Sequence, residues 1–163
     1  MESTFAALAE FPPALEKHYA LFPERFAHWA PPSWEGVPSE AFTAIEQICH
    51  VRDIEIEGYQ QRFRRTLKED TPHLPSMDSE TLARQRDYGR SNAARTLAEF
   101  RVARAQTLEL LRELDDVDLQ RGAIFEGYGP VTLRALIHYL CSHDQQHLAG
   151  LQWLLGKLES VRA

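Results

Sequence analysis

The chain is poor in the features that would mark it for export or for a membrane. Only two cysteines occur, Cys49 and Cys141, which are too few for a disulfide framework. No apolar run is long enough to cross a bilayer, and the first residues lack the charged and apolar regions of a signal peptide. These absences predict a cytoplasmic protein without a membrane partner.

Positive charge is also scarce, since the formal net charge is −6. A protein that binds nucleic acid needs a basic face, so no nucleic-acid partner is expected. The segment from Gly127 to Pro130 lacks the lysine and the preceding strand of a phosphate-binding loop. No G-x-S-x-G nucleophile elbow occurs either. A small molecule is therefore the expected partner.

Strand-type alternation and internal repeats are absent as well, whereas helical periodicity is strong. Apolar residues recur every three or four positions, the pattern of helices with one buried face. A chain of 163 residues is long enough to bury one substantial core, so residues 1–163 are predicted to form a single all-α domain, a four-helix bundle. The periodic segments are residues 14–29, 40–67, 79–114 and 133–155.

Local signals predict where these helices begin and bend. Pro12 and Pro13 suit the first turn of the first helix, where a missing N–H costs nothing. Ser39 and Thr132 are expected N-caps of the second and last helices, and Gly89 is expected to bend the third helix. Two connections are long for neighbouring antiparallel helices, so a crossover connection and a simple up-and-down bundle are both consistent with the sequence.

The last helix carries His143 and His147, which lie one turn apart on the same face and can bind one metal ion. His50 lies in the middle of the second helix among apolar residues, so a bundle would bring it opposite this pair. Three histidines leave coordination positions open, as in catalytic rather than structural zinc sites. The alternative is that His50 is a hydrogen-bonded core histidine and that the pair is partly exposed.

Four further polar residues are candidates near such a site. Asp53, Glu57 and Asp144 are spaced so that a carboxylate can orient an imidazole, although solvated carboxylates fit the same spacing. Arg104 borders the leucine seam of the third helix, where an edge arginine with its head in solvent is expected. If it faces the pocket instead, it can bind an anionic part of a substrate.

Several stretches resemble the DinB/YfiT-like superfamily. One is GYGPVTL at residues 127–133, which leads into the last helix, and another is HDQQHLA at residues 143–149 within that helix. HVRD at residues 50–53 and the leucine seam after Arg104 are similar to the second and third helices of the family. The resemblance covers about residues 11–157 of the chain.

The resemblance implies a four-helix bundle that holds a divalent metal ion, zinc or nickel, on three histidines. Carried over position by position, these ligands are His50, His143 and His147. Characterised members include transferases and isomerases that use low-molecular-weight thiols. The resemblance therefore implies a metal-dependent enzyme with such a thiol as a candidate cosubstrate, although many members have no known activity.

The leading functional hypothesis is an enzyme whose metal ion activates a small thiol or water for attack on a small electrophile. The sequence shows no obvious general base, which slightly favours thiol transfer over hydrolysis. The alternative is a stress-related bundle that binds a metal or a small molecule without turnover. In either case a homodimer is an expected form of the protein.

Overall fold

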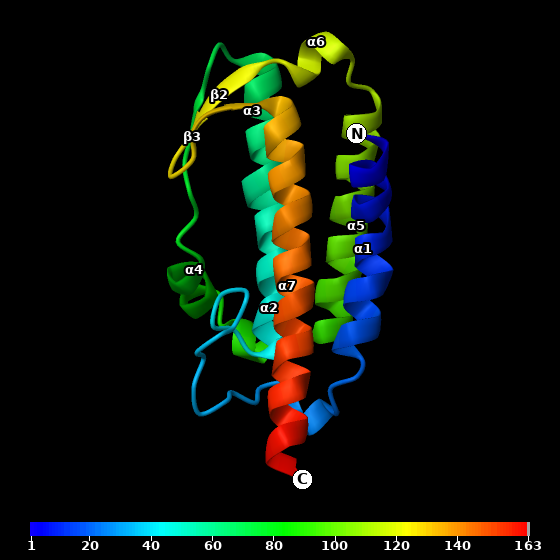
Figure 1. Cartoon of the computed structure of the whole chain (residues 1–163), viewed down its shortest axis with the longest axis vertical. Helices are drawn as coiled ribbons and strands as arrows, with labels where there is room; N and C mark the ends of the chain where they lie inside the picture. The colour runs from blue at the N-terminus through cyan, green and yellow to red at the C-terminus, as the bar shows by residue number, and fades with distance from the viewer. Residues whose placement is uncertain (163) are drawn as a thin grey trace.

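Four long helices packed side by side form the body of the protein (Figure 1). The computed structural model describes residues 1–162. The second of the long helices is continuous, but its middle part is a π-helix, labelled η2. The all-α bundle predicted from the sequence is confirmed. The long helices are α1 (Glu2–Tyr19), α2–η2–α3 (Ala44–Asp53, Ile54–Tyr59 and Gln60–Lys68), α5 (Ala93–Arg112) and α7 (Leu133–Arg162).

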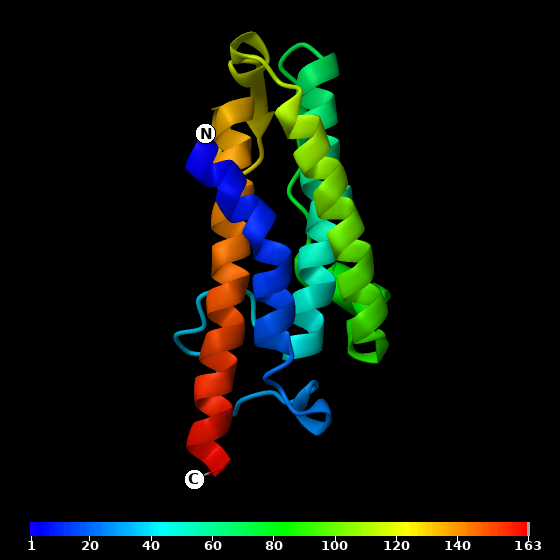
Figure 2. The ribbon, with the colours of Figure 1, turned by 90° about the vertical axis from the view of Figure 1, so that its right-hand side faces the viewer.

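The connectivity of the bundle includes a crossover. The helix α1 packs between α5 and α7, and α2 packs between the same two helices on the other side, so α1 and α2 are diagonal to each other. The second long helix and α5 run in the same direction, as Figures 1 and 2 show. Residues 69–92 must therefore return along the whole bundle before α5 begins, and this explains the length of that connection.

The helix predicted over residues 79–114 is interrupted rather than bent. It consists of α4 (Ser79–Gln85), a 3₁₀ turn, η3 (Tyr88–Arg90), and α5. Asp87 adopts a left-handed conformation with φ 48°, which no helix interior accepts. Asn92 then caps α5, because its side chain accepts a hydrogen bond of 2.9 Å from the Arg95 N–H.

A small sheet covers one end of the bundle, at the top of Figure 1. Its strands are β1 (His73–Leu74), β2 (Gly122–Phe125) and β3 (Gly129–Thr132); β1 pairs parallel to β2, and β2 pairs antiparallel to β3. A short helix, α6 (Asp116–Leu119), precedes β2. The expectation of no strands is wrong, because strands of two to four residues are too short to show alternation. Thr132 caps α7 as predicted, accepting the Ala135 N–H at 3.2 Å.

The second long helix begins later than predicted. Thr43 precedes the first turn of α2, and its N–H donates to the Glu46 carboxylate at 2.8 Å. This is half of a capping box. Ser39 is therefore not the N-cap, and residues 39–42 belong to the loop that leads into the helix. As a result Glu40 is free of the helix and can turn towards the bundle.

The first helix contains Pro12 and Pro13 in its interior, so the prediction that they open it is wrong. Proline leaves the carbonyl four residues earlier without its helical donor. For Pro12 that carbonyl belongs to Leu8, and Nη1 of Arg104 donates to it at 3.0 Å. A side chain from α5 thus replaces the hydrogen bond that Pro12 removes, and the helix continues.

Arg104 is the centre of a buried ion-pair network and is only 1% exposed. It donates to Glu55 from Nε and Nη2 at 3.0 and 2.9 Å, and to Asp144 from Nη1 and Nη2 at 2.7 and 3.0 Å. Together with the bond to Leu8, these contacts use all five N–H groups of the guanidinium. The edge position expected for Arg104 is therefore wrong.

The apolar core is divided by a layer of buried polar side chains. One apolar cluster includes Leu136 and Leu140 of α7, and the other includes Leu151 and Leu154, one to two turns beyond the histidines of the same helix. The layer between them contains buried residues of α2, η2, α5 and α7. These residues are His50, Glu55, Arg104, Asp144 and His147.

Within residues 1–162, no helix combines the length and the apolar character that crossing a membrane requires.

Replacing Arg104 tests this network. The Arg104→Met variant leaves two buried carboxylates and one carbonyl without a donor, so its free energy of unfolding should fall by about 3–5 kcal/mol. Urea denaturation followed by circular dichroism measures the change. The control is Arg101→Met on the same helix, where an exposed pair with Glu16 is removed and a loss below about 1 kcal/mol is expected. Equal losses in the two variants would contradict the assigned role.

Candidate metal centre

His50, His143 and His147 converge on one point, from α2 and α7. The Nε2 atoms of His50 and His147 each lie 3.1 Å from Nε2 of His143. Ligands held at about 2.0–2.1 Å from one zinc ion are about 3.3 Å apart in a tetrahedral arrangement. The three nitrogens therefore have the spacing of a set of metal ligands, and they form a group that can hold a divalent ion.

Two of the histidines, His50 and His143, lie where neutral imidazole is the favoured form. Burial is the main cause that lowers the pKa of His50 and of His143 below the ordinary value, and the neighbouring histidines lower both further. A neutral imidazole has one nitrogen free to bind a metal ion. Packing helps to hold the rings, since Phe42 lies 5.3 Å from the ring of His50 and Tyr59 lies 6.2 Å from that of His143.

Gln47 orients the third ligand. Its Oε1 atom accepts a hydrogen bond from Nδ1–H of His147, so Nε2 of that ring presents its lone pair to the centre. The amide of Gln47 is itself fixed, because Nε2 donates to Oγ of Ser39 at 2.8 Å and to the carbonyl of Glu40 at 3.3 Å. Gln47 is not among the residues predicted from the sequence, although its position three residues before His50 places it on the same helix face.

Glu40 lies on the solvent side of the three rings. Its carboxylate oxygens are 3.2 Å from Nε2 of His147 and 3.6 Å from Nε2 of His50. Its side chain is 38% exposed, whereas those of the two histidines are 0% and 1% exposed. A carboxylate repels an imidazole lone pair at this distance unless a cation lies between them. The donor set of three nitrogens and a nearby carboxylate therefore fits a bound divalent cation.

The loop that carries Glu40 is held tightly against α7. Ser39 packs over Gly150, where an added Cβ would lie only 2.3 Å from the Ser39 hydroxyl. Further along the loop, Trp34 stacks on Trp153 with ring centroids 6.1 Å apart. Gly150 and Trp153 follow His147 on the same helix, so the position of Glu40 is tied to that of His147.

Two of the predicted carboxylates do not face the histidines. Asp53 accepts hydrogen bonds from Tyr88 at 2.6 Å and from Arg86 and Arg52 at 2.7 Å each. Burial raises the pKa of Asp53, but these hydrogen bonds lower it below its ordinary value. Glu57 is exposed and pairs with Arg86. Neither residue has a hydrogen bond to an imidazole within residues 1–162.

Asp144 and Arg104 face each other instead of the pocket. Asp144 follows His143 directly, but its carboxylate is bound to the guanidinium of Arg104. Arg104 has no N–H group left to bind the anionic part of a substrate. Their ion pair fixes the part of α7 from which His143 projects, so both residues affect the position of that imidazole without touching it.

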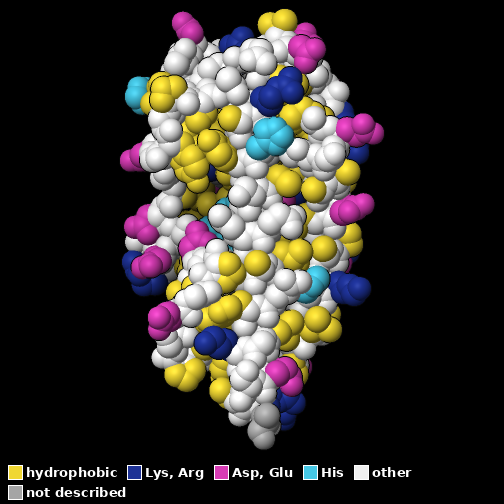
Figure 3. Space-filling model, in the orientation of Figure 1, with side chains coloured by type: hydrophobic (Ala, Val, Ile, Leu, Met, Phe, Trp, Pro, Cys, Tyr) yellow, Lys and Arg dark blue, Asp and Glu magenta, His cyan; other side chains and the backbone are white. Residues whose placement is uncertain are grey.

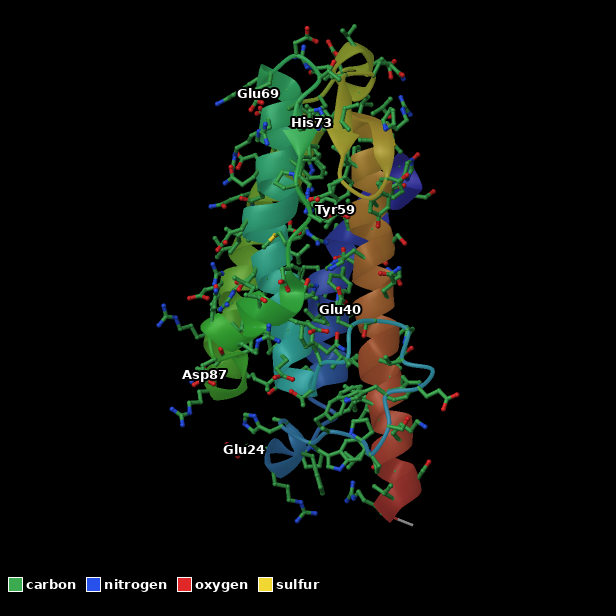
Figure 4. The ribbon with its side chains drawn as sticks, turned by 90° about the vertical axis from the view of Figure 1, so that its left-hand side faces the viewer. Glu24, Glu40, Tyr59, Glu69, His73 and Asp87 are labelled. Carbon is green, nitrogen blue, oxygen red and sulfur yellow. The ribbon has the colours of Figure 1, made fainter. Side chains whose placement is uncertain are left out.

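The centre is open on one face of the molecule. Figure 3 shows a hollow beside α7, with histidine at its floor and an acidic side chain at its rim. In Figure 4, Tyr59 and Glu40 lie in the space between the α2–α3 helix and α7, Tyr59 on the side of the sheet. The centre is reached from this side at His143, which is partly exposed, whereas His50 and His147 are buried.

A solved structure shares this architecture. It is described as YfiT from *Bacillus subtilis*, a probable metal-dependent hydrolase with an unusual four-helix bundle topology. It matches with a TM-score of 0.82 over 97% of this chain and 87% of that chain, at 21% sequence identity. At this identity the likeness shows a common fold. No curated protein is similar enough to this chain to count as a match.

A family model covers most of the chain. Residues 7–151 match the model described as the DinB superfamily, and the matched region contains all three histidines, Gln47 and Glu40. The resemblance inferred from the motifs is confirmed: the chain belongs to the DinB superfamily.

Proposed function

We propose that this protein is a metal-dependent hydrolase that acts on a small molecule. The observation that carries the proposal is the convergence of three imidazole nitrogens, 3.1 Å apart in two pairs, beneath a half-exposed carboxylate. His50, His143 and His147 would hold a divalent ion, and the solvent side of the centre would receive the substrate. Zinc is the first choice for such a site and nickel the second.

When bound, the ion supplies Lewis acidity, which polarises a carbonyl or phosphoryl oxygen and makes water nucleophilic near neutral pH. Glu40 is placed to accept the proton of the attacking water and to return it to the leaving group. Gln47 keeps His147 in the tautomer that binds metal and keeps the Glu40 segment in place. The floor of the pocket stays dry because His50 and His147 are buried.

Glu40 changes the balance between the two reactions suggested by the sequence. Thiol transfer is favoured there because the sequence shows no general base, and we propose Glu40 for that role. The description of YfiT as a probable metal-dependent hydrolase supports the same choice. Thiol transfer stays as the second candidate, because the open side of the centre also admits a thiol. Homodimer formation stays a prediction.

Metal content is the first test. Protein purified without a metal-chelating tag should contain about one divalent ion per chain, as measured by mass spectrometry of the metal. The His143→Ala variant should lose it, because two imidazoles bind far more weakly than three. The control is His138→Ala, an exposed histidine of α7. If His143→Ala is folded and keeps as much metal as the unmodified protein, the proposed centre is wrong.

The second test concerns the reaction. The Glu40→Gln variant preserves the size of the side chain but not its basicity, so kcat for hydrolysis should fall by about 10²–10⁴ while metal content is retained. Activated esters, lactones, amides and phosphate esters would be assayed with and without added thiols. Glu35→Gln, an exposed residue of the same loop, is the control. If product forms only when a thiol is present, the reaction is thiol transfer and not hydrolysis.

The third test addresses Gln47. The Gln47→Leu variant cannot accept the Nδ1–H of His147 and releases Ser39 and Glu40, so the metal dissociation constant should rise about 10–100-fold. Competition with a fluorescent chelator measures this constant. Gln106→Leu, an exposed position of α5, serves as the control. An unchanged dissociation constant in Gln47→Leu would show that the hydrogen bond does not orient the ligand.

A further inference from the structure

Arg62 of α3 is a buried cation without a carboxylate partner among residues 1–162. The residue is only 6% exposed, and its guanidinium forms no ion pair with any carboxylate of residues 1–162. Buried charges in proteins are normally paired, because an unpaired charge loses its hydration without compensation. Arg104 obeys this rule with two carboxylates and five hydrogen bonds, so Arg62 stands apart within the same bundle.

The contacts of Arg62 leave part of its hydrogen-bonding capacity unused. Nη2 donates to the carbonyl of Pro75 at 3.1 Å, but the Nε–H is buried and has no partner within residues 1–162. The guanidinium also lies over two aromatic rings, 4.5 Å from the centroid of Phe125 and 5.0 Å from that of Tyr59. Cation–π contacts stabilise the charge but accept none of its N–H groups.

Tyr59 connects Arg62 to the metal centre. The guanidinium of Arg62 lies over the ring of Tyr59. The centroid of the same ring lies 6.2 Å from that of His143. Tyr59 is therefore in contact with the guanidinium of Arg62 on one side and lies close to the ring of His143 on the other.

Arg62 has a cavity on one side and aromatic rings on the other. A cavity of about 120 Å³ lies beside it, between α3 and the segment Leu74–Met77. On the other side, Phe125 stacks on Tyr128 with centroids 4.6 Å apart, and Tyr128 contacts Tyr139 at 4.7 Å. Tyr139 lies one turn before His143 on α7. The wall between Arg62 and the metal centre is therefore aromatic.

From this arrangement we infer that Arg62 is an anion-binding residue and that the substrate is a small organic anion. The carboxylate, phosphate or sulfonate group of this molecule binds the guanidinium, with the unused Nε–H as one donor. Its apolar or aromatic body lies against the tyrosines, and the bond to be hydrolysed reaches the histidines. The reaction rests on the proposed hydrolase function, whereas anion binding depends on Arg62 alone.

Binding to the metal-free protein tests the anion site separately from catalysis. After removal of metal with a chelator, the protein is titrated calorimetrically with benzoate, phenyl phosphate and benzenesulfonate, and with neutral benzamide. At least one anion should bind about tenfold or more tightly than benzamide, because hydrogen bonds to charged groups are the strong ones. In Arg62→Gln this preference should disappear. Which of the three anions binds most tightly identifies the oxyanion.

The remaining variants make each outcome decisive. Arg64→Gln removes an exposed arginine of the same helix that does not line this cavity, and it should keep the preference. Arg62→Gln should stay folded at the temperature of the titration, as circular dichroism measures, because the variant removes a buried charge that no carboxylate of residues 1–162 pairs. Absence of the preference in the unmodified protein, its persistence in Arg62→Gln, or unfolding of Arg62→Gln each overturns the inference. If anions bind only when Arg62 is present but the protein shows no metal-dependent hydrolysis, only the proposed reaction is contradicted.

Discussion

The ion-pair network of Arg104 is the interaction on which the bundle and its site depend. One guanidinium from α5 binds the carboxylates of Glu55 on η2 and Asp144 on α7, and the carbonyl of Leu8 on α1. It therefore joins all four long helices at one level of the core. Because Pro12 deprives Leu8 of its helical donor, the same network allows a proline within α1. The histidines that converge on the metal centre project from the helices at this level.

The metal centre lies where this polar layer reaches solvent. Polar groups without hydrogen-bond partners are unfavourable inside an apolar core. In this layer every N–H group of Arg104 has an acceptor on the inner side, and the histidines lie together at the open side. Gln47 joins the two parts of the site, since one end of its amide binds His147 and the other end binds the loop of Glu40. The ligand and the carboxylate are thus positioned by one side chain.

The two buried arginines show how the same residue type can serve structure or ligand binding. Arg104 has as many acceptors as donors, so it has no further role to play with a substrate. Arg62 has two aromatic rings, one carbonyl and a buried N–H without an acceptor. Counting acceptors around each guanidinium, rather than noting that it is buried, distinguishes a structural residue from a candidate binding residue.

The sequence by itself determined what depends on local spacing. His143 and His147 lie on one helix face because they are four residues apart, and the periodicity of the leucines around them is sufficient to predict the bundle.

Only the tertiary structure decided which side chains meet across helices. The crossover places α2 beside α7, so His50 joins the pair. The late start of α2 at Ala44 frees Glu40, and Gly150 lets the loop of Glu40 approach α7. Arg104 found its partners in Glu55 and Asp144, which are 49 and 40 residues away in the chain. No periodicity records such contacts, because they depend on how the helices are ordered and turned in the bundle.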